Sequence, residues 1–170
     1  VLGDACFDIA KFVLTDRINP EDANVPLYTQ SLSAGSKTGG MAANLELGLR
    51  SLASQTPKIA VSSALPDPKL WGTKTRVYDA NGTYLFRYDE DKTATPFVYD
   101  ESILAGVSLV LVSDYNKGFI TDHVLARLTR DCFDANIPVI VDTKKTDLQN
   151  LNSAYVKVNK SEAEKVKQWG

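Results

Sequence analysis

The segment 38–44 holds the residues best suited to bind a small polar molecule. It reads Thr-Gly-Gly-Met-Ala-Ala-Asn, and Gly39 and Gly40 form a predicted tight loop that opens a helix. Glycines let the backbone approach a ligand closely, and the unpaired amides at a helix N-terminus favour oxygen-rich or anionic groups. The segment therefore predicts a ligand-binding helix start with Asn44 in its first turn. A surface loop without a ligand is the alternative interpretation.

Two aspartates near the N-terminus offer carboxylates to the same kind of ligand. Asp4 and Asp8 follow a short apolar run at the start of the chain. Carboxylates accept hydrogen bonds from hydroxyl groups, and we prefer this interpretation to metal binding or acid–base chemistry because no third carboxylate or histidine lies close in the sequence. A solvated or capping role is the alternative.

Three further polar loops each follow an apolar run typical of a buried parallel strand. They are Ser113-Asp114-Tyr115-Asn116-Lys117-Gly118 after 107–112, Asp142-Thr143-Lys144 after 138–141, and Asn159-Lys160-Ser161-Glu162 after 154–158. Lys117 suits a phosphate or a solvated loop tip. The spacing of Asn159 and Glu162 suits the ordering of a hydrated Mg²⁺, or else the two residues cap a helix.

The elements that must position these loops alternate between strand and helix. A helix is predicted over 121–135, with Leu125, Leu128 and Cys132 on one face and Asn136 as its C-cap. The sequence Ser-Glu-Ala-Glu from Ser161 has the form of a capping box and predicts another helix start. The alternation predicts a doubly wound, mostly parallel α/β sheet, in which ligands bind beyond the carboxyl ends of the strands.

One segment departs from this alternation. Asn81-Gly82 lies between two strand-like runs in 73–89 and predicts an antiparallel hairpin with a two-residue turn. That register sets Val77 opposite Phe86, Tyr78 opposite Leu85 and Arg76 opposite Arg87. Because facing arginines repel, either an anion lies between them or they extend into water with Asp89, Glu90 and Asp91 as counterions.

The composition limits the classes of function. The chain has 170 residues and a net charge of −2, which gives no broad electrostatic attraction to nucleic acid or to an anionic membrane. Cys6, Cys132 and His123 lack the spacing of a zinc site, so we interpret both cysteines as buried apolar residues. With no signal-peptide pattern and no apolar run of membrane-spanning length, a cytoplasmic location is expected.

Together these segments resemble the ribokinase-like (PfkB-type) carbohydrate kinases, and most closely the branch of D-glycero-D-manno-heptose-7-phosphate kinases. The resemblance covers nearly the whole chain. It rests on matches that occur in the family's order: Gly3-Asp4 with Asp8, Arg17-Ile18-Asn19-Pro20-Glu21 with Val25-Pro26, Gly39-Gly40-Met41-Ala42-Ala43-Asn44, Lys74-Thr75-Arg76 with Arg87-Tyr88-Asp89, Ser113-Asp114-Tyr115-Asn116-Lys117-Gly118, Asp142-Thr143-Lys144, and Asn159-Lys160-Ser161-Glu162.

The resemblance implies ATP-dependent, Mg²⁺-dependent phosphorylation of a sugar or sugar phosphate. It implies that the hairpin at about 73–89 is a β-lid that covers the sugar and often joins two subunits into a homodimer. It also implies site residues for substrate and cofactor. Substrate would contact Asp4, Asp8, Arg17, Gly39, Gly40, Asn44, Lys74, Arg76, Arg87, Asp114 and Lys117; Lys144, Asn159 and Glu162 would serve the nucleotide, the last two holding Mg²⁺ through water.

Two departures from the family pattern qualify this expectation. The stretch 51–72 is shorter than the two strand–helix units expected there. The family's Gly-Ala-Gly-Asp motif, with its general-base aspartate, and the nucleotide pocket would lie beyond Gly170, so residues 1–170 are expected to form a partial kinase domain that is inactive alone. A catalytically inactive relative that binds a sugar phosphate or dimerises through its lid is the alternative function, and an adenosine or fructose-6-phosphate kinase is a narrower one.

Overall fold

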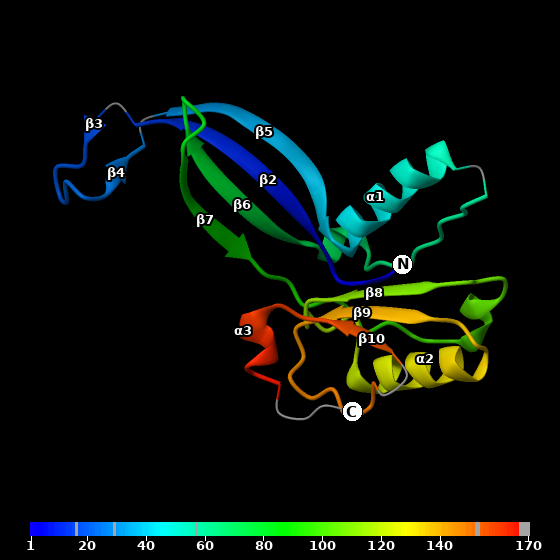
Figure 1. Cartoon of the computed structure of the whole chain (residues 1–170). Helices are drawn as coiled ribbons and strands as arrows, with labels where there is room; N and C mark the ends of the chain where they lie inside the picture. Colours follow the sequence, from blue (N-terminus) through cyan, green and yellow to red (C-terminus); the bar gives the residue numbers. More distant parts are fainter. Residues whose placement is uncertain (16, 29, 57, 152–153, 167–170) are drawn as a thin grey trace.

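The chain folds into a parallel sheet and a second, mixed sheet that rises from one end of it (Figure 1). The structure is a computed structural model and describes residues 1–15, 17–28, 30–56, 58–151 and 154–166. The parallel sheet has the order β1 (Leu2–Gly3), β8 (Val110–Asp114), β9 (Val139–Thr143) and β10 (Tyr155–Lys157). All three of its pairings are parallel, which confirms the predicted fold class.

Helix α2 (Asp122–Asp134) makes the crossover between β8 and β9 and buries its apolar face. Thr121 caps its first turn by accepting a hydrogen bond from the amide of Val124 at 3.2 Å. Asn136 adopts φ 54°, the left-handed conformation of a C-terminal cap. Leu125, Leu128 and Cys132 lie in the core, as their spacing predicts.

The mixed sheet, here called the lid, is larger than the predicted hairpin. Its order is β5 (Gln30–Met41), β2 (Ala5–Leu14), β6 (Gly72–Asp79) and β7 (Tyr84–Glu90), with β2 parallel to β6 and the other two pairings antiparallel. A short ribbon of β3 (Arg17–Ile18) and β4 (Pro26–Leu27) extends from its far end. The prediction of a two-stranded lid was therefore wrong in size.

The turn of the lid hairpin also differs from the prediction. Asp79 accepts hydrogen bonds at its side chain from the amides of Asn81 and Thr83, at 2.8 and 2.7 Å, and Gly82 has φ 83°. The result is a three-residue loop followed by a bulge, a common alternative to the two-residue turn. Arg76 still faces Arg87 as predicted, but Tyr78 faces Tyr84 and not Leu85.

Helix α1 (Ala42–Gln55) begins directly at the end of β5. Gly39 and Gly40 thus belong to a strand and not to a tight loop. Between α1 and β6 the described residues contain only the 3₁₀ turn η1 (Pro68–Leu70) and one isolated bridge between Leu2 and Ala64. A second 3₁₀ turn, η2 (Glu101–Leu104), precedes β8.

The last described helix, α3 (Lys160–Ala163), begins two residues earlier than the Ser161 capping box predicted. Its capping box is formed by Asn159 and Glu162, each accepting from the other's backbone amide, at 2.9 and 2.8 Å. The two residues therefore cap α3, and this contact does not test the prediction that they also order a hydrated Mg²⁺.

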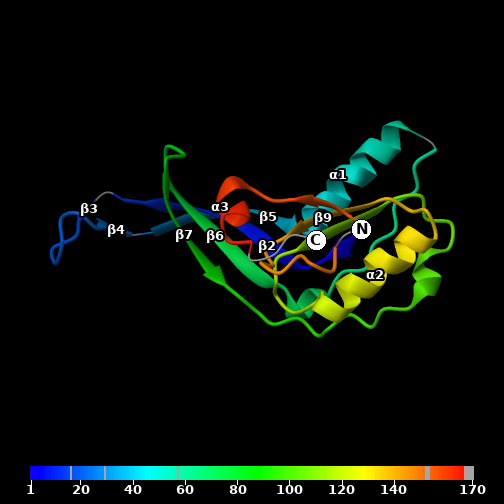
Figure 2. The same cartoon turned by 60° about the horizontal axis from the view of Figure 1, so that its bottom comes forward.

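The two longer helices lie on opposite sides of the parallel sheet, α1 near the base of the lid and α2 on the far side (Figures 1 and 2). The main apolar core fills the space between α2 and the parallel sheet, where Leu128 and Val141 are fully buried. Among the helices of the described residues, none is long and apolar enough to cross a bilayer. Chain segments far apart in the sequence, 3–8, 40–44 and 113–119, meet where the lid joins the parallel sheet.

Candidate functional site

The junction of β5 and α1 is built without room for a side chain at Gly40. A Cβ atom at this position would lie 2.5 Å from Oδ2 of Asp8 and 2.7 Å from Sγ of Cys6. At Gly39 a Cβ would lie 2.8 Å from the Cβ of Ala43. The glycine pair therefore makes space for the Asp8 carboxylate beside the helix start, and burial raises the pKa of the neighbouring Cys6 thiol.

Helix α1 starts at this point with an unusual backbone. Met41 precedes the helix with φ 57°, a conformation that non-glycine residues rarely adopt. The first helical amide, that of Ala42, donates to the carbonyl of Asp4 at 3.0 Å, but no side chain caps the helix. Amides of the first turn thus remain available for an oxygen-rich ligand, as the sequence predicts. Asn44 is exposed in that turn.

Asp4 points into the protein and not toward a ligand. Its side chain is 1% exposed, and it accepts from the amides of Tyr115, Lys117 and Phe119 at 2.7, 3.1 and 3.3 Å. One carboxylate therefore fixes the loop after β8. Asp4 has no exposed oxygen that supports the predicted contact with substrate hydroxyls. Its contacts agree with the capping alternative.

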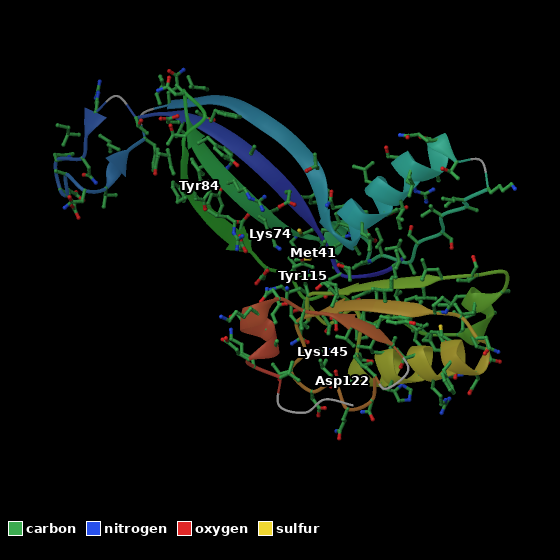
Figure 3. The ribbon with its side chains drawn as sticks, viewed as in Figure 1. Met41, Lys74, Tyr84, Tyr115, Asp122 and Lys145 are labelled. Atoms are coloured by element: carbon green, nitrogen blue, oxygen red, sulfur yellow. The ribbon has the colours of Figure 1, made fainter. Side chains whose placement is uncertain are left out.

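Asp114 is likewise buried, at 0% exposure, and forms the centre of a second polar cluster. Oδ1 accepts from the amide of Asn116 and Oδ2 from the hydroxyl of Thr143, both at 2.9 Å. Nζ of Lys145 lies 3.7 Å from this carboxylate and 2.9 Å from Asp122 (Figure 3). Burial raises the pKa of Asp114, and the Lys145 ammonium opposes that rise. Asp114 therefore supports the loop, and its buried carboxylate offers no exposed oxygen for the predicted substrate contact.

Asp8, Lys74 and Arg76 share one face of the lid. The register pairs Asp8 with Lys74, and Nη1 of Arg76 lies 2.9 Å from Oδ1 of Asp8. The hydrogen bond that Arg76 donates to Asp8 raises the pKa of the Arg76 guanidinium. Arg87 pairs instead with Asp89 at 2.9 Å. Each of the two facing arginines thus pairs with a carboxylate of its own. The partner of Arg87, Asp89, is one of the counterions predicted from the sequence.

The polar loop after β8 meets the lid at Tyr115. Nζ of Lys74 lies 4.6 Å from the centroid of the Tyr115 ring, and Nζ of Lys144 lies 5.1 Å from it. Figure 3 shows Lys74 and Tyr115 side by side where the lid meets the parallel sheet. Lys117 forms an ion pair with Asp91, in the segment that leaves the lid. Most of the predicted cations therefore gather at this junction.

The residues expected to hold Mg²⁺ through water lie at the carboxyl end of β10. Hydrogen bonds from the Asn159 amide and from Lys144 lower the pKa of Glu162. Close by, Asp142 pairs with Lys157 through Oδ2 at 2.9 Å, while its buried Oδ1 has no hydrogen-bond partner in the described part of the chain. The described residues contain no group of three or more His, Cys, Asp or Glu able to hold a metal ion. The ordering of a hydrated Mg²⁺ by Asn159 and Glu162 therefore stays a prediction.

The predicted site residues therefore fall into three groups. One group meets at the base of the lid: Asp8, Gly39, Gly40, Asn44, Lys74, Arg76, Lys117 and Lys144, with Arg87 on the next strand and Asn159 and Glu162 at the neighbouring strand end. Asp4 and Asp114 lie beneath this junction. Arg17 is exposed on the β3–β4 ribbon at the far end of the lid, apart from all of them (Figure 1).

Tyr115 and Lys145 were not among the predicted site residues, although Tyr115 lies in one predicted loop and Lys145 directly follows another. Tyr115 has no charge, and Lys145 follows another lysine, so neither stood out by type. Their position at the ends of β8 and β9 was the available signal, because those ends are adjacent in a parallel sheet.

Comparison with known proteins agrees with this geometry. No protein-family model matches the chain. The chain is 30% identical over 183 aligned residues to the Bifunctional protein HldE of Hyphomonas neptunium, covering 91% of this chain and 37% of that protein. It is 29% identical over 186 residues to the protein of the same name from Campylobacter jejuni subsp. doylei, covering 96% and 40%. The chain is thus similar in sequence to part of each of these HldE proteins. It spans about two fifths of the length of these relatives.

Solved structures support the fold. A possible 1-phosphofructokinase from Thermotoga maritima superposes with a TM-score of 0.50 at 14% identity, covering 89% of this chain and 55% of that one. A protein titled Sa239 superposes with a TM-score of 0.52 at 10% identity, covering 96% and 66%. The resemblance to ribokinase-like carbohydrate kinases and the ribokinase-like fold class are thus confirmed.

The tight space at Gly40 leads to a prediction. Gly40→Ala is expected to lower the free energy of unfolding by about 1–3 kcal/mol, because the new methyl group displaces the Asp8 carboxylate or the Cys6 thiol from a packed position. Chemical denaturation followed by circular dichroism measures the change. Gly48→Ala is the matched control: it lies within α1 with nothing within 4 Å, and alanine there should be neutral or stabilising. Equal effects of the two variants would contradict the prediction.

Proposed function

We propose that the protein containing this chain is an ATP-dependent kinase of a sugar or sugar phosphate, similar to heptose-phosphate kinases, and that these residues supply mainly its sugar-binding and lid part. One observation carries the proposal. The face of the lid that bears Asp8, Lys74 and Arg76 meets the start of α1 and the loop after β8 at one place. A carboxylate, two cations and helix amides thus converge as a phosphorylated polyol requires.

Within this proposal the residues have separate tasks. The helix amides beyond Gly40 and the Asp8 carboxylate bind sugar oxygens. Lys74 and Arg76 bind the phosphate of a phosphosugar, since guanidinium and ammonium groups pair with phosphate oxygens. Asp4 and Asp114 hold the β8 loop in position from beneath. Phosphoryl transfer depends on such positioning and on charge stabilisation.

ATP and Mg²⁺ are part of the proposal as well. Bound Mg²⁺ would neutralise charge on the transferring phosphoryl group. Asn159 and Glu162, with the unpartnered Oδ1 of Asp142 nearby, carry the oxygen atoms of this chain that would order its water shell. Lys144, bound to Glu162, supplies a cation at the same strand ends.

The lid is also proposed as a homodimer interface. Its other face carries the partly exposed aromatic side chains of Phe86 and Tyr88, at 36% and 38%, and Tyr28, which precedes β5, packs on Phe86 and is 38% exposed. β5 and β7 are edge strands whose outer side is unpaired within the described sheet. A cytoplasmic location is proposed in addition, since Cys6 and Cys132 are buried free thiols.

The proposed function is tested by ADP production with the protein containing this chain, supplied with heptose 7-phosphate, fructose 6-phosphate or ribose. We expect the phosphorylated sugars to react faster than ribose. Equal rates with all three would contradict a phosphosugar substrate. Binding of a phosphosugar with no ADP formed from any of them would favour the alternative, a catalytically inactive sugar-phosphate-binding or dimerising relative.

Arg76 provides a sharper test of the substrate class. Arg76→Ala is expected to raise KM for a phosphosugar by about tenfold or more, because a charge-assisted contact with phosphate is lost. KM for a neutral sugar should change much less. The matched control is Arg130→Ala, an exposed arginine on α2 that pairs with Asp131 and lies away from the lid. If Arg76→Ala leaves the ratio of the two KM values unchanged, Arg76 does not contact the phosphate.

A further inference from the structure

The Tyr115 ring joins the lid to the parallel sheet through two lysines. Nζ of Lys74, in β6 of the lid, lies 4.6 Å from the ring centroid, and Nζ of Lys144, directly after β9, lies 5.1 Å from it. Both distances are within the range of a cation–π contact. One aromatic ring therefore holds ammonium groups from two separate sheets (Figure 3).

The backbone that carries this ring is fixed from beneath. The amide of Tyr115 donates to the buried Asp4 carboxylate at 2.7 Å, and the next amide, that of Asn116, donates to Asp114 at 2.9 Å. Asn116 adopts φ 57°, and the amide of Lys144 donates to the carbonyl of Asp114 at 2.9 Å. The backbone of Tyr115 and that of Lys144 are thus fixed by hydrogen bonds to buried groups.

The two lysines differ in their other contacts. Lys144 also forms an ion pair with Glu162. Among the described residues Lys74 forms no ion pair or hydrogen bond, and its ammonium group contacts the Tyr115 ring instead. Two like charges drawn to one ring repel each other, and a doubly charged anion beside them would relieve that repulsion.

We propose that Tyr115 is a positioning residue whose ring orients both Lys74 of the lid and Lys144 of the parallel sheet, so that the two ammonium groups together bind a phosphorylated ligand. The proposal rests on the proposed phosphosugar function and adds to it a residue and a cation pair. Tyr115 itself does not contact the phosphate. It orients the two groups that do.

Binding of fructose 6-phosphate and of fructose to the protein containing this chain tests the proposal by isothermal titration calorimetry. Tyr115→Leu removes the π system at similar bulk, and we expect it to weaken fructose 6-phosphate binding about fivefold or more while fructose binding changes less than about twofold. Tyr115→Phe keeps the ring and should restore binding to within about twofold. Equal loss for both sugars, or no loss for fructose 6-phosphate, would overturn the proposal.

A second measurement needs no ligand. A ring within cation–π distance shifts the ε-methylene resonances of Lys74 and Lys144 upfield in NMR spectra, and Tyr115→Leu should remove the shift while Tyr115→Phe retains it. Ordinary lysine resonances in the unmodified protein would overturn the positioning role. If the shift is present but fructose 6-phosphate does not bind the unmodified protein, the positioning geometry stands, whereas the phosphate-binding pair and the phosphosugar function fail.

Discussion

Asp4→Ala is expected to lower the free energy of unfolding by at least about 3 kcal/mol, because three backbone amides lose their buried acceptor at once. None of the three can turn to water without moving the loop after β8, since Asp4 is 1% exposed. Asp4→Asn should lower the free energy of unfolding less, because the side-chain carbonyl oxygen of asparagine still accepts hydrogen bonds from these amides. Urea denaturation followed by circular dichroism measures both changes.

A matched control for Asp4 is Asp67→Ala. Asp67 is exposed and accepts from a single amide, that of Lys69, at 2.9 Å at the start of η1. Asp67→Ala should lower the free energy of unfolding much less than Asp4→Ala, because water can accept the hydrogen bond of the Lys69 amide in place of the aspartate. A similar loss of stability in the two variants would mean that the three amide contacts of Asp4 do not stabilise the fold.

Lys145→Met is the second substitution with a large expected effect. It keeps the apolar stem but removes the ammonium group 3.7 Å from the buried Asp114, and we expect a loss of about 3–5 kcal/mol in the free energy of unfolding near pH 7. The cause is an ionised carboxylate left in the interior without a cation. Lys157→Met is the matched control, because Lys157 pairs with Asp142 at 63% exposure and should contribute less than about 1 kcal/mol.

The loss in Lys145→Met should depend on pH in a defined direction. Burial already holds the pKa of Asp114 above its ordinary value of 3.8, and removal of Lys145 raises it further. Because of the raised pKa, Asp114 binds a proton more tightly in the folded state than in the unfolded state. The loss in the free energy of unfolding therefore grows as pH rises from 3.8 through the raised pKa. The difference between the two proteins should therefore shrink on acidification. A difference that is constant between pH 8 and pH 4.5 would exclude Asp114 as the cause.

The sequence was most informative about the parallel sheet. Runs such as Val-Leu-Val at 110–112 are apolar on both faces, and only a strand covered on both sides accommodates such a run. The apolar face of α2 and Asn136 at its C-terminal end predicted the crossover helix in the same way. These signals are local, and local patterns can be interpreted without knowledge of the rest of the chain.

The lid was only partly predictable because two of its strands lack a regular alternation. β5 carries Gly35, Gly39 and Gly40, and its pairing with β2 contains register irregularities near Lys11 and Val13. Such strands gain their stability from neighbours that lie far away in the sequence. The prediction of the hairpin turn failed for a related reason: the Asp79 side chain accepts from two amides and thereby favours a three-residue loop over the expected two-residue turn.

For the candidate site, the correct loops were predictable but the direction of each side chain was not. Asp4 and Asp114 have the residue type of a ligand contact, yet both carboxylates turn inward to satisfy backbone amides. Lys74 and Arg76 were expected at the lid and lie there. Whether a strand-end aspartate faces a ligand or the interior depends on tertiary hydrogen bonds, which no spacing reveals.

The single residue between β1 and β2 has a mechanical consequence. The chain leaves the parallel sheet at Gly3 and enters the lid at Ala5, so only Asp4, anchored by three amides, separates the two. Across from it, β5 continues into α1 through Met41 without a linker. Any closing motion of the lid would therefore have to move its four strands together about this junction, and it would change the distance between Lys74 and the Tyr115 ring.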